Sequence, residues 1–178
     1  MIARRVRFAG LVLLAAPAAC GYSLAGRGDF LPASIRTIGV PLFANQTPVF
    51  EAEQRLTERV RSEFIGRGRY RVLPNAEGAD AVLTGTITSI AIVPASFDAG
   101  RQATRYRIVV TTSLEFRDVK ADKVLWSNPA WQFSEEYDVT TGLSALDPNA
   151  FFDQDRTALD RLAQEFARAV VSAILEAF

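Results

Sequence analysis

The chain has 178 residues, in which 20 Lys and Arg balance 20 Asp and Glu, and it contains no histidine and one cysteine. The missing histidine excludes Ser-His-Asp and Cys-His catalytic pairs, histidine zinc sites and a haem histidine ligand. A lone cysteine can neither close an internal disulfide nor form a thiolate metal cage. With 49% apolar and 22% charged residues, the chain is too hydrophobic for disorder and too balanced in charge for an electrostatic nucleic-acid binder. We therefore expect one folded domain without a catalytic residue, a metal or a cofactor.

The N-terminus has the layout of a secretory signal. Arg4, Arg5 and Arg7 precede an apolar run over 8–19, which leads directly into Cys20. This run is much shorter than the about 20 residues that a membrane-spanning helix needs. The sequence thus predicts a cleaved signal rather than an anchor helix.

Cys20 follows Pro17-Ala18-Ala19 at the end of this run and resembles the lipidation cysteine of bacterial lipoproteins. The alternative is an incidental cysteine beside an ordinary cleavage site. The resemblance implies the outer membrane, since the familiar sorting rule retains a protein at the inner membrane when Asp stands where this chain has Gly21. We expect a lipoprotein signal peptide over 1–19, a lipidated tether over 20–33 and a single domain over 34–178.

The first half of the domain should hold a strand and a helix. Residues 35–43 alternate and predict a strand with Ile38 and Val40 on one face. Thr47 can act as an N-cap with Pro48 at the first helical position, so a helix should begin there and end at Gly66. Its apolar stripe consists of Val49, Ala52, Leu56, Val60 and Phe64, and the residues expected to face water are Arg55, Glu58, Arg59 and Arg61.

Four further strands are expected over 69–73, 81–93, 104–119 and 124–137, the last of them interrupted by Pro129. The third has the clearest alternation. Its predicted buried face holds Tyr106, Ile108, Val110, Leu114 and Phe116, and its polar face holds Arg105, Arg107, Thr111, Ser113 and Glu115. The strand before it carries a matching polar row of Thr84, Thr86 and Thr88. Residues 120–123 should join the third and fourth of these strands as a hairpin.

Residues 139–146 are predicted to form a loop, and Asp147-Pro148 should begin a final helix. The apolar stripe of this helix is Leu159, Leu162, Phe166, Val170, Ala173 and Ile174. The sequence therefore predicts an α+β fold of order β-α-β-β-β-β-α. We expect a mostly antiparallel four- to five-stranded sheet with the two helices packed on one face.

With these elements placed, the chain resembles the LptE family of lipopolysaccharide-assembly lipoproteins. Order and spacing carry the resemblance, and the matching stretches are 20–24, 38–47, 51–57, 69–72, 79–85 and 125–126. The resemblance implies two helices on one sheet and a lipid anchor on the periplasmic side of the outer membrane. It also implies an LptD-type β-barrel as partner, which such a protein plugs and helps to assemble for lipopolysaccharide export.

Arg101, Arg105 and Arg107 cluster where the strand predicted over 104–119 begins, and their guanidinium groups suit the phosphates of lipopolysaccharide. The alternative is a solubilising edge of the sheet. The polar sheet face likewise suits either solvent or the hydrated lumen of an outer-membrane barrel.

Two other functions fit parts of the sequence. The stretch 40–47 also suits an outer-membrane lipoprotein that activates peptidoglycan synthesis or belongs to a secretion channel. An envelope enzyme could use a carboxylate pair such as Glu135 and Glu136, or Asp153 and Asp155. Neighbours in a strand point to opposite faces, and neither pair stands in a recognisable motif, so solvated surface acids are the better interpretation of these pairs.

Overall fold

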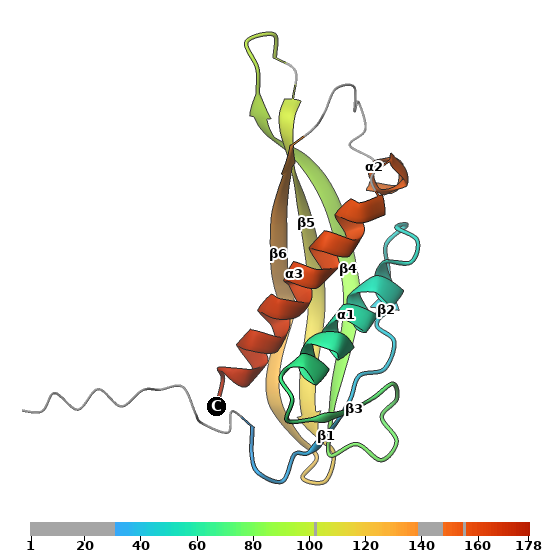
Figure 1. Ribbon diagram of the computed structural model, residues 1–178, viewed down its shortest axis with the longest axis vertical. Coiled ribbons are helices and arrows are strands. Elements are labelled where there is room, and N and C mark those ends of the chain that lie inside the picture. Colours follow the sequence, from blue (N-terminus) through green and yellow to red (C-terminus); the bar gives the residue numbers. More distant parts are fainter. Residues whose placement is uncertain (1–30, 102, 139–147, 155) are drawn as a thin grey trace, which may run out of the picture.

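The computed structural model describes residues 31–101, 103–138, 148–154 and 156–178 (Figure 1). The elements are β1 (Thr37–Gly39), β2 (Ala44–Asn45), α1 (Ala52–Gly66), β3 (Arg71–Leu73), β4 (Ala81–Phe97), β5 (Ala103–Asp118), β6 (Lys123–Asp138), α2 (Pro148–Gln154) and α3 (Arg156–Leu175). The predicted α+β class is thus confirmed.

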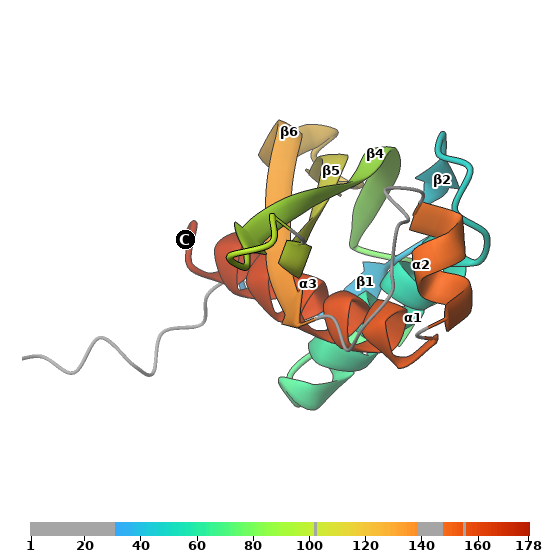
Figure 2. The same ribbon diagram turned by 90° about the horizontal axis from the view of Figure 1, so that it is seen from above.

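Helices and sheet form two layers. In Figures 1 and 2, α1 and α3 lie side by side on one face of the sheet that is built mainly by β4, β5 and β6. The core fills the space between the layers, and its largest fully buried side chains include Phe43, Phe64, Phe116 and Phe166. Two helices on one face of the sheet, as predicted, leave the other face open.

The sheet has six strands in the order β3-β1-β4-β5-β6, with β2 paired to β4. Strands β4, β5 and β6 are antiparallel, but β1 runs parallel to β3 and β4, and β2 runs parallel to β4. The long strands thus pair antiparallel as predicted, but the sheet has six strands instead of four to five, and its short strands make it partly mixed. The strand predicted over 35–43 is shorter than expected, because β1 covers only Thr37–Gly39 and ends before Pro41, which lacks a backbone N–H; the separate strand β2 follows the predicted range. Helix α1 acts as a crossover that returns the chain in the same direction, and this makes β1 and β3 parallel.

The start of α1 also differs from the prediction. The helix begins at Ala52, with Glu51 as its N-cap in the left-handed region at φ 60°. Thr47 is not the cap, because Asn45 Oδ1 accepts hydrogen bonds from both the Thr47 N–H and its hydroxyl, while Asn45 Nδ2 donates to the Val49 carbonyl. These local side-chain bonds hold residues 45–49 as a turn, in competition with a helix.

The residues of the predicted apolar stripe are all buried: Ala52, Leu56, Val60 and Phe64 lie in α1, and Val49 lies in the turn before it. The prediction that Arg61 faces water was wrong. Its guanidinium is half-buried and donates to the backbone carbonyls of Val40, at 2.9 Å, and Pro74, at 3.2 Å. Arg61 thus ties α1 to the ends of β1 and β3.

The alternation predicted for the long strands is confirmed. Buried residues of β5 face the helices, and they are Tyr106, Ile108, Val110, Leu114 and Phe116. Strand β6 is an edge strand and continues through Pro129, where the pairing skips from Thr112 opposite Trp131 to Leu114 opposite Asn128. Proline is tolerated here because an edge strand needs no hydrogen-bond donor on its open side.

The C-terminal segment begins with Pro148, as predicted, but forms two helices, α2 and α3, instead of one. The apolar stripe of α3 is buried except for Ala173, which is half-buried. Phe166 packs edge-on against Phe133 of β6 at a centroid distance of 6.1 Å. The Tyr137 hydroxyl donates to the Ala158 carbonyl at 3.2 Å, so α3 is fixed to β6 by both apolar and polar contacts. The predicted loop over 139–146 and Asp147 lie outside the described residues.

Candidate functional site

The sheet face opposite the helices is polar along β4 and β5. Two of its threonines form hydrogen bonds within the sheet, since Thr84 Oγ1 donates to the Glu115 carbonyl and Thr88 Oγ1 to the Thr111 carbonyl, at 3.4 and 3.0 Å. The surface is therefore hydroxyl-rich, and its hydroxyl groups belong to exposed or half-buried residues. Such a face suits contact with water or with a hydrated partner surface, and it offers no activated nucleophile.

Arg105 and Arg107 lie on this face near the start of β5. Both form ion pairs with Glu136 of β6. Arg107 donates to Glu136 Oε1 through Nη2 at 2.5 Å and Nε at 3.2 Å, and Arg105 Nη1 lies 3.5 Å from Oε2. The three side chains keep between 38% and 47% of their surface exposed. The hydrogen bond from Arg107 is the main reason that the pKa of Glu136 lies below its ordinary value, and charge attraction to both arginines adds to it. Two cations thus share one carboxylate at a solvent-accessible position.

Arg101 lies apart from this pair, in the turn that joins β4 to β5. Its backbone N–H donates to the Asp98 carbonyl at 3.0 Å, and its φ of 62° is left-handed. The side chain is exposed and forms no ion pair within the described residues. Arg105 and Arg107 are therefore brought together as predicted from their spacing, while Arg101 extends the positive charge towards the hairpin tip.

Sequence reasoning missed Glu136 as the partner of these arginines. The register places Arg107 opposite Glu136 and Ile108 opposite Glu135, so the two glutamates belong to opposite faces of β6. This arrangement agrees with the expectation that the pair does not act as a catalytic dyad. Asp155 and the side chain of Asp153 lie outside the described residues, as does Cys20.

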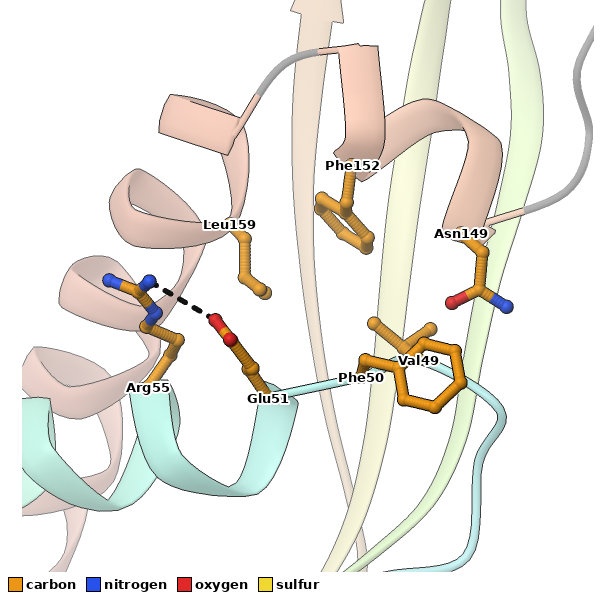
Figure 3. Close-up of a pocket in the computed structure, with 7 residues that line it drawn as sticks. All are labelled: Val49, Phe50, Glu51, Arg55, Asn149, Phe152 and Leu159. Carbon is orange, nitrogen blue, oxygen red and sulfur yellow. Dashed lines mark hydrogen bonds and ion pairs between the residues drawn. The ribbon is translucent and has the colours of Figure 1, made fainter.

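A second feature is a pocket between the start of α1 and the helices α2 and α3 (Figure 3). Its volume is about 280 Å³, and its apolar residues are Val49, Phe50, Phe152 and Leu159. Phe50 and Asn149 lie at one end, and the ion pair of Glu51 and Arg55 lies at the other (Figure 3). Phe50 is 83% exposed, although it follows the fully packed Val49. Sequence patterns carried no signal for this pocket, because the predicted helix start would have placed Phe50 within a helix.

The charged rim of this pocket is already internally paired. Arg55 Nη2 lies 3.2 Å from Glu51, and Nη1 lies 3.2 Å from Asp160 of α3. The pKa of Arg55 is raised first by the hydrogen bond to Glu51 and then by the charge of Asp160. The ion pairs tie the start of α1 to α3, and the pocket presents an apolar floor rather than reactive groups.

No helix in the described part of the chain is long and apolar enough to span a membrane. Among the same residues, no group of three or more acids could hold a metal ion.

Comparison with known proteins places the fold and the family. The family model of LptE, lipopolysaccharide-assembly, matches residues 35–174 of this chain. No curated protein matches the chain in sequence.

Several solved structures share the fold. The solution structure of an uncharacterised lipoprotein B from Nitrosomonas europaea is 13% identical with a TM-score of 0.51, over 88% of each chain. The hypothetical protein CT253 from Chlamydia trachomatis is 10% identical with a TM-score of 0.52, over 79% of this chain and 96% of that one. A PelC dodecamer structure from Paraburkholderia phytofirmans is 20% identical with a TM-score of 0.49, over 82% of this chain and 92% of that one. At these identities the first two likenesses describe the fold alone.

Proposed function

Because this chain belongs to the LptE family of lipopolysaccharide-assembly proteins, we propose that it is an outer-membrane lipoprotein that plugs an LptD-type β-barrel. In this role it helps the barrel to assemble and supports lipopolysaccharide export to the cell surface. It acts by binding a partner rather than by catalysis. The family assignment is the premise, and the structure adds the surface on which such a role can be tested.

The observation that carries the proposal is the open polar face of the sheet. Helices α1 and α3 cover one face, while the other presents threonine hydroxyls, Arg105, Arg107 and Glu136. The interior of an outer-membrane barrel is hydrated and polar, so a face of this chemistry can enter it without leaving apolar surface in water. A sheet with two apolar faces would have needed a second layer of helices.

The anchor belongs to the same proposal. Cleavage before Cys20 and acylation of that residue would hold the domain at the periplasmic side of the outer membrane, because each buried methylene contributes about 0.8 kcal/mol. Intact-mass measurement of protein extracted from membranes tests this step. Protein with an unmodified Cys20, or cleaved at another position, would contradict the anchor and leave the domain's fold unaffected.

The plug role is tested by purification of the tagged protein from outer membranes and identification of what accompanies it. A photoreactive residue at Ser113 of the polar face should crosslink to the LptD-type barrel, and the same residue at Arg59, on the water-facing side of α1, serves for comparison. Depletion should lower the amount of assembled barrel and of surface lipopolysaccharide, with glycolipid accumulating at earlier stages. Normal barrel and normal surface lipopolysaccharide after complete depletion would contradict the role. Copurification with peptidoglycan synthases or a secretion channel would favour the alternative function.

We further propose that Arg101, Arg105 and Arg107 bind phosphate groups of lipopolysaccharide. A guanidinium fork suits phosphate geometry, and both Arg105 and Arg107 already bind an anionic oxygen in the form of Glu136.

A further inference from the structure

The described chain begins at the end of the domain opposite to the β4–β5 hairpin (Figure 1). The described chain starts at Leu31, beside β1, β3 and the turn between β5 and β6, whereas the hairpin projects from the other end of the long strands (Figure 1). The arginines near the hairpin are therefore far from the point at which the chain emerges. Positive charge also occurs at the emerging end, and the proposed function gives it no role.

A cleft of about 250 Å³ lies at this end, between the first described residues and the segment before β3. Leu31 and Ile35 are almost fully buried and contribute apolar lining, as does Tyr70. The exposed residues Arg36 and Arg69 add two guanidinium groups. A cleft that joins apolar surface to guanidinium groups matches the boundary between the phosphate and the glycerol of a phospholipid headgroup.

Arg71 adds a third exposed guanidinium close to this cleft. Its backbone N–H donates to the Arg36 carbonyl at 2.9 Å, and β1 and β3 are neighbours in the sheet. Neither Arg36 nor Arg71 forms an ion pair with another residue of the part that the structure describes.

The Asp80 carboxylate, which lies beside β1, already accepts hydrogen bonds at both of its oxygens. Asp80 accepts hydrogen bonds from the backbone N–H groups of Arg36 and Thr37 and from Lys120 Nζ. Among the described residues, its two oxygens therefore bond backbone N–H groups and Lys120, and they form no ion pair with the guanidinium groups of Arg36 or Arg71.

We propose that this surface, defined by Arg36, Arg69 and Arg71 and called here the anchor-end surface, binds the phosphates of anionic phospholipids. The inference rests on the proposed anchor for its biological setting, because acyl chains on Cys20 place this end next to the leaflet. The chain between Cys20 and Leu31 reaches at most about 40 Å even when fully extended. Acyl chains and a basic surface are two independent membrane signals, and together they orient the domain on the lipid as well as retain it.

The experiment measures vesicle binding without the acyl chains. The chain from residue 20 onward, with Cys20→Ser, is sedimented with phosphatidylcholine vesicles that contain or lack phosphatidylglycerol. Binding should require phosphatidylglycerol and should weaken as salt is added, since exposed charges are screened. The double variant Arg36→Gln/Arg71→Gln should bind about fivefold more weakly for each arginine removed.

The matched control is Arg59→Gln/Arg168→Gln, which removes the same charge from exposed positions on α1 and α3. Equal weakening by both double variants would show that only net charge matters and would overturn the anchor-end surface. Binding that does not depend on phosphatidylglycerol would overturn it as well.

A charge-preserving variant separates folding from binding. Arg36→Lys/Arg71→Lys should bind anionic vesicles nearly as well as the unmodified chain, and a loss equal to that of the glutamine variant would also contradict the proposal. Because neither acylation nor the barrel takes part, these outcomes are independent of the anchor and plug tests. An unmodified Cys20 in cells would refute the proposed anchor while the vesicle result stood on its own.

Discussion

Lys120 Nζ lies 2.6 Å from Asp80 Oδ1 and joins the turn between β5 and β6 to a residue 40 positions earlier in the chain. The second oxygen of Asp80 accepts the backbone N–H groups of Arg36 and Thr37 at 3.0 and 2.9 Å. One carboxylate therefore connects three segments at the anchor end of the domain. These bonds lower the pKa of Asp80 to about 2, the Lys120 hydrogen bond being the largest cause and the two backbone N–H groups the next.

This arrangement predicts a dependence of stability on pH. The ordinary pKa of Asp80 is 3.8, and the folded value is lower, so the unfolded state binds the proton more tightly. The stabilisation is complete above about pH 4 and is lost as the pH falls towards 2. After allowance for solvent screening, Asp80 should contribute about 1–2 kcal/mol.

Urea melts of the unmodified chain and of Asp80→Asn, made between pH 2 and pH 7, measure this contribution. The difference between their free energies of unfolding should be largest near neutral pH and should shrink below about pH 4. Asp122→Asn is the comparison, because among the described residues the Asp122 carboxylate pairs only with Arg117 and is itself 88% exposed. A difference for Asp80→Asn that stayed constant over this pH range would contradict the assigned role.

The second prediction concerns Thr57 and the free energy of unfolding. This fully buried residue of α1 accepts the Phe43 N–H at 3.0 Å and donates to the Glu53 carbonyl at 2.5 Å. Thr57→Val keeps the shape but leaves the buried Phe43 N–H without an acceptor, so it should cost about 1–3 kcal/mol. Thr57→Ser retains the hydroxyl and should recover the part of the loss that belongs to the hydrogen bond. Denaturant melts in which serine and valine are equally destabilising would assign the effect to packing instead.

Substitutions at two nearby residues of α3 test whether its apolar face belongs to the core. Phe166 is fully buried against Phe133, so Phe166→Ala should lower the free energy of unfolding by about 3–5 kcal/mol. Arg168 is exposed and, within the described part of the chain, pairs only with Glu165 of the same helix, at 2.8 Å. Arg168→Ala should therefore change the free energy of unfolding by less than about 0.5 kcal/mol. Similar denaturation midpoints for the two variants would mean that this face of the helix is not core.

Local patterns predicted the faces of the elements well. The stripes that contain Leu56 and Phe166, and the alternation around Ile108, are buried as expected because helix and strand periods are properties of adjacent residues. The parallel pairing of β1 with β3 and β4 was missed, since strand pairing joins distant segments and leaves no local mark. The start of α1 was missed because Asn45 commits its side chain to a turn.

The candidate site was predictable only in part. The spacing of Arg105 and Arg107 placed both on one face of a strand, and the structure agrees. Which residue of β6 lies opposite them depends on the register between β5 and β6, and this register shifts at the bulge around Pro129. A pairing set by a bulge cannot be counted from sequence spacing, because each skipped residue moves the following side chains to the other face.

Glu136 gives the last prediction, which concerns the proposed lipopolysaccharide contact. Its carboxylate is shared by Arg105 and Arg107, and its lowered pKa keeps it negatively charged at neutral pH. Glu136→Gln removes that charge while both guanidinium groups remain, so the purified domain should bind lipopolysaccharide more tightly, most clearly at low salt. Arg105→Gln/Arg107→Gln should bind it more weakly, and Arg101→Gln should weaken it further. The control is Glu165→Gln, which removes the same charge from an exposed pair on α3. Unchanged affinity in the arginine variants, with the fold intact, would contradict the proposed arginine contact and leave the plug role untouched.

Equal gains in affinity from Glu136→Gln and Glu165→Gln would show that only net charge matters. A specific site requires that the gain depend on the position of the removed carboxylate.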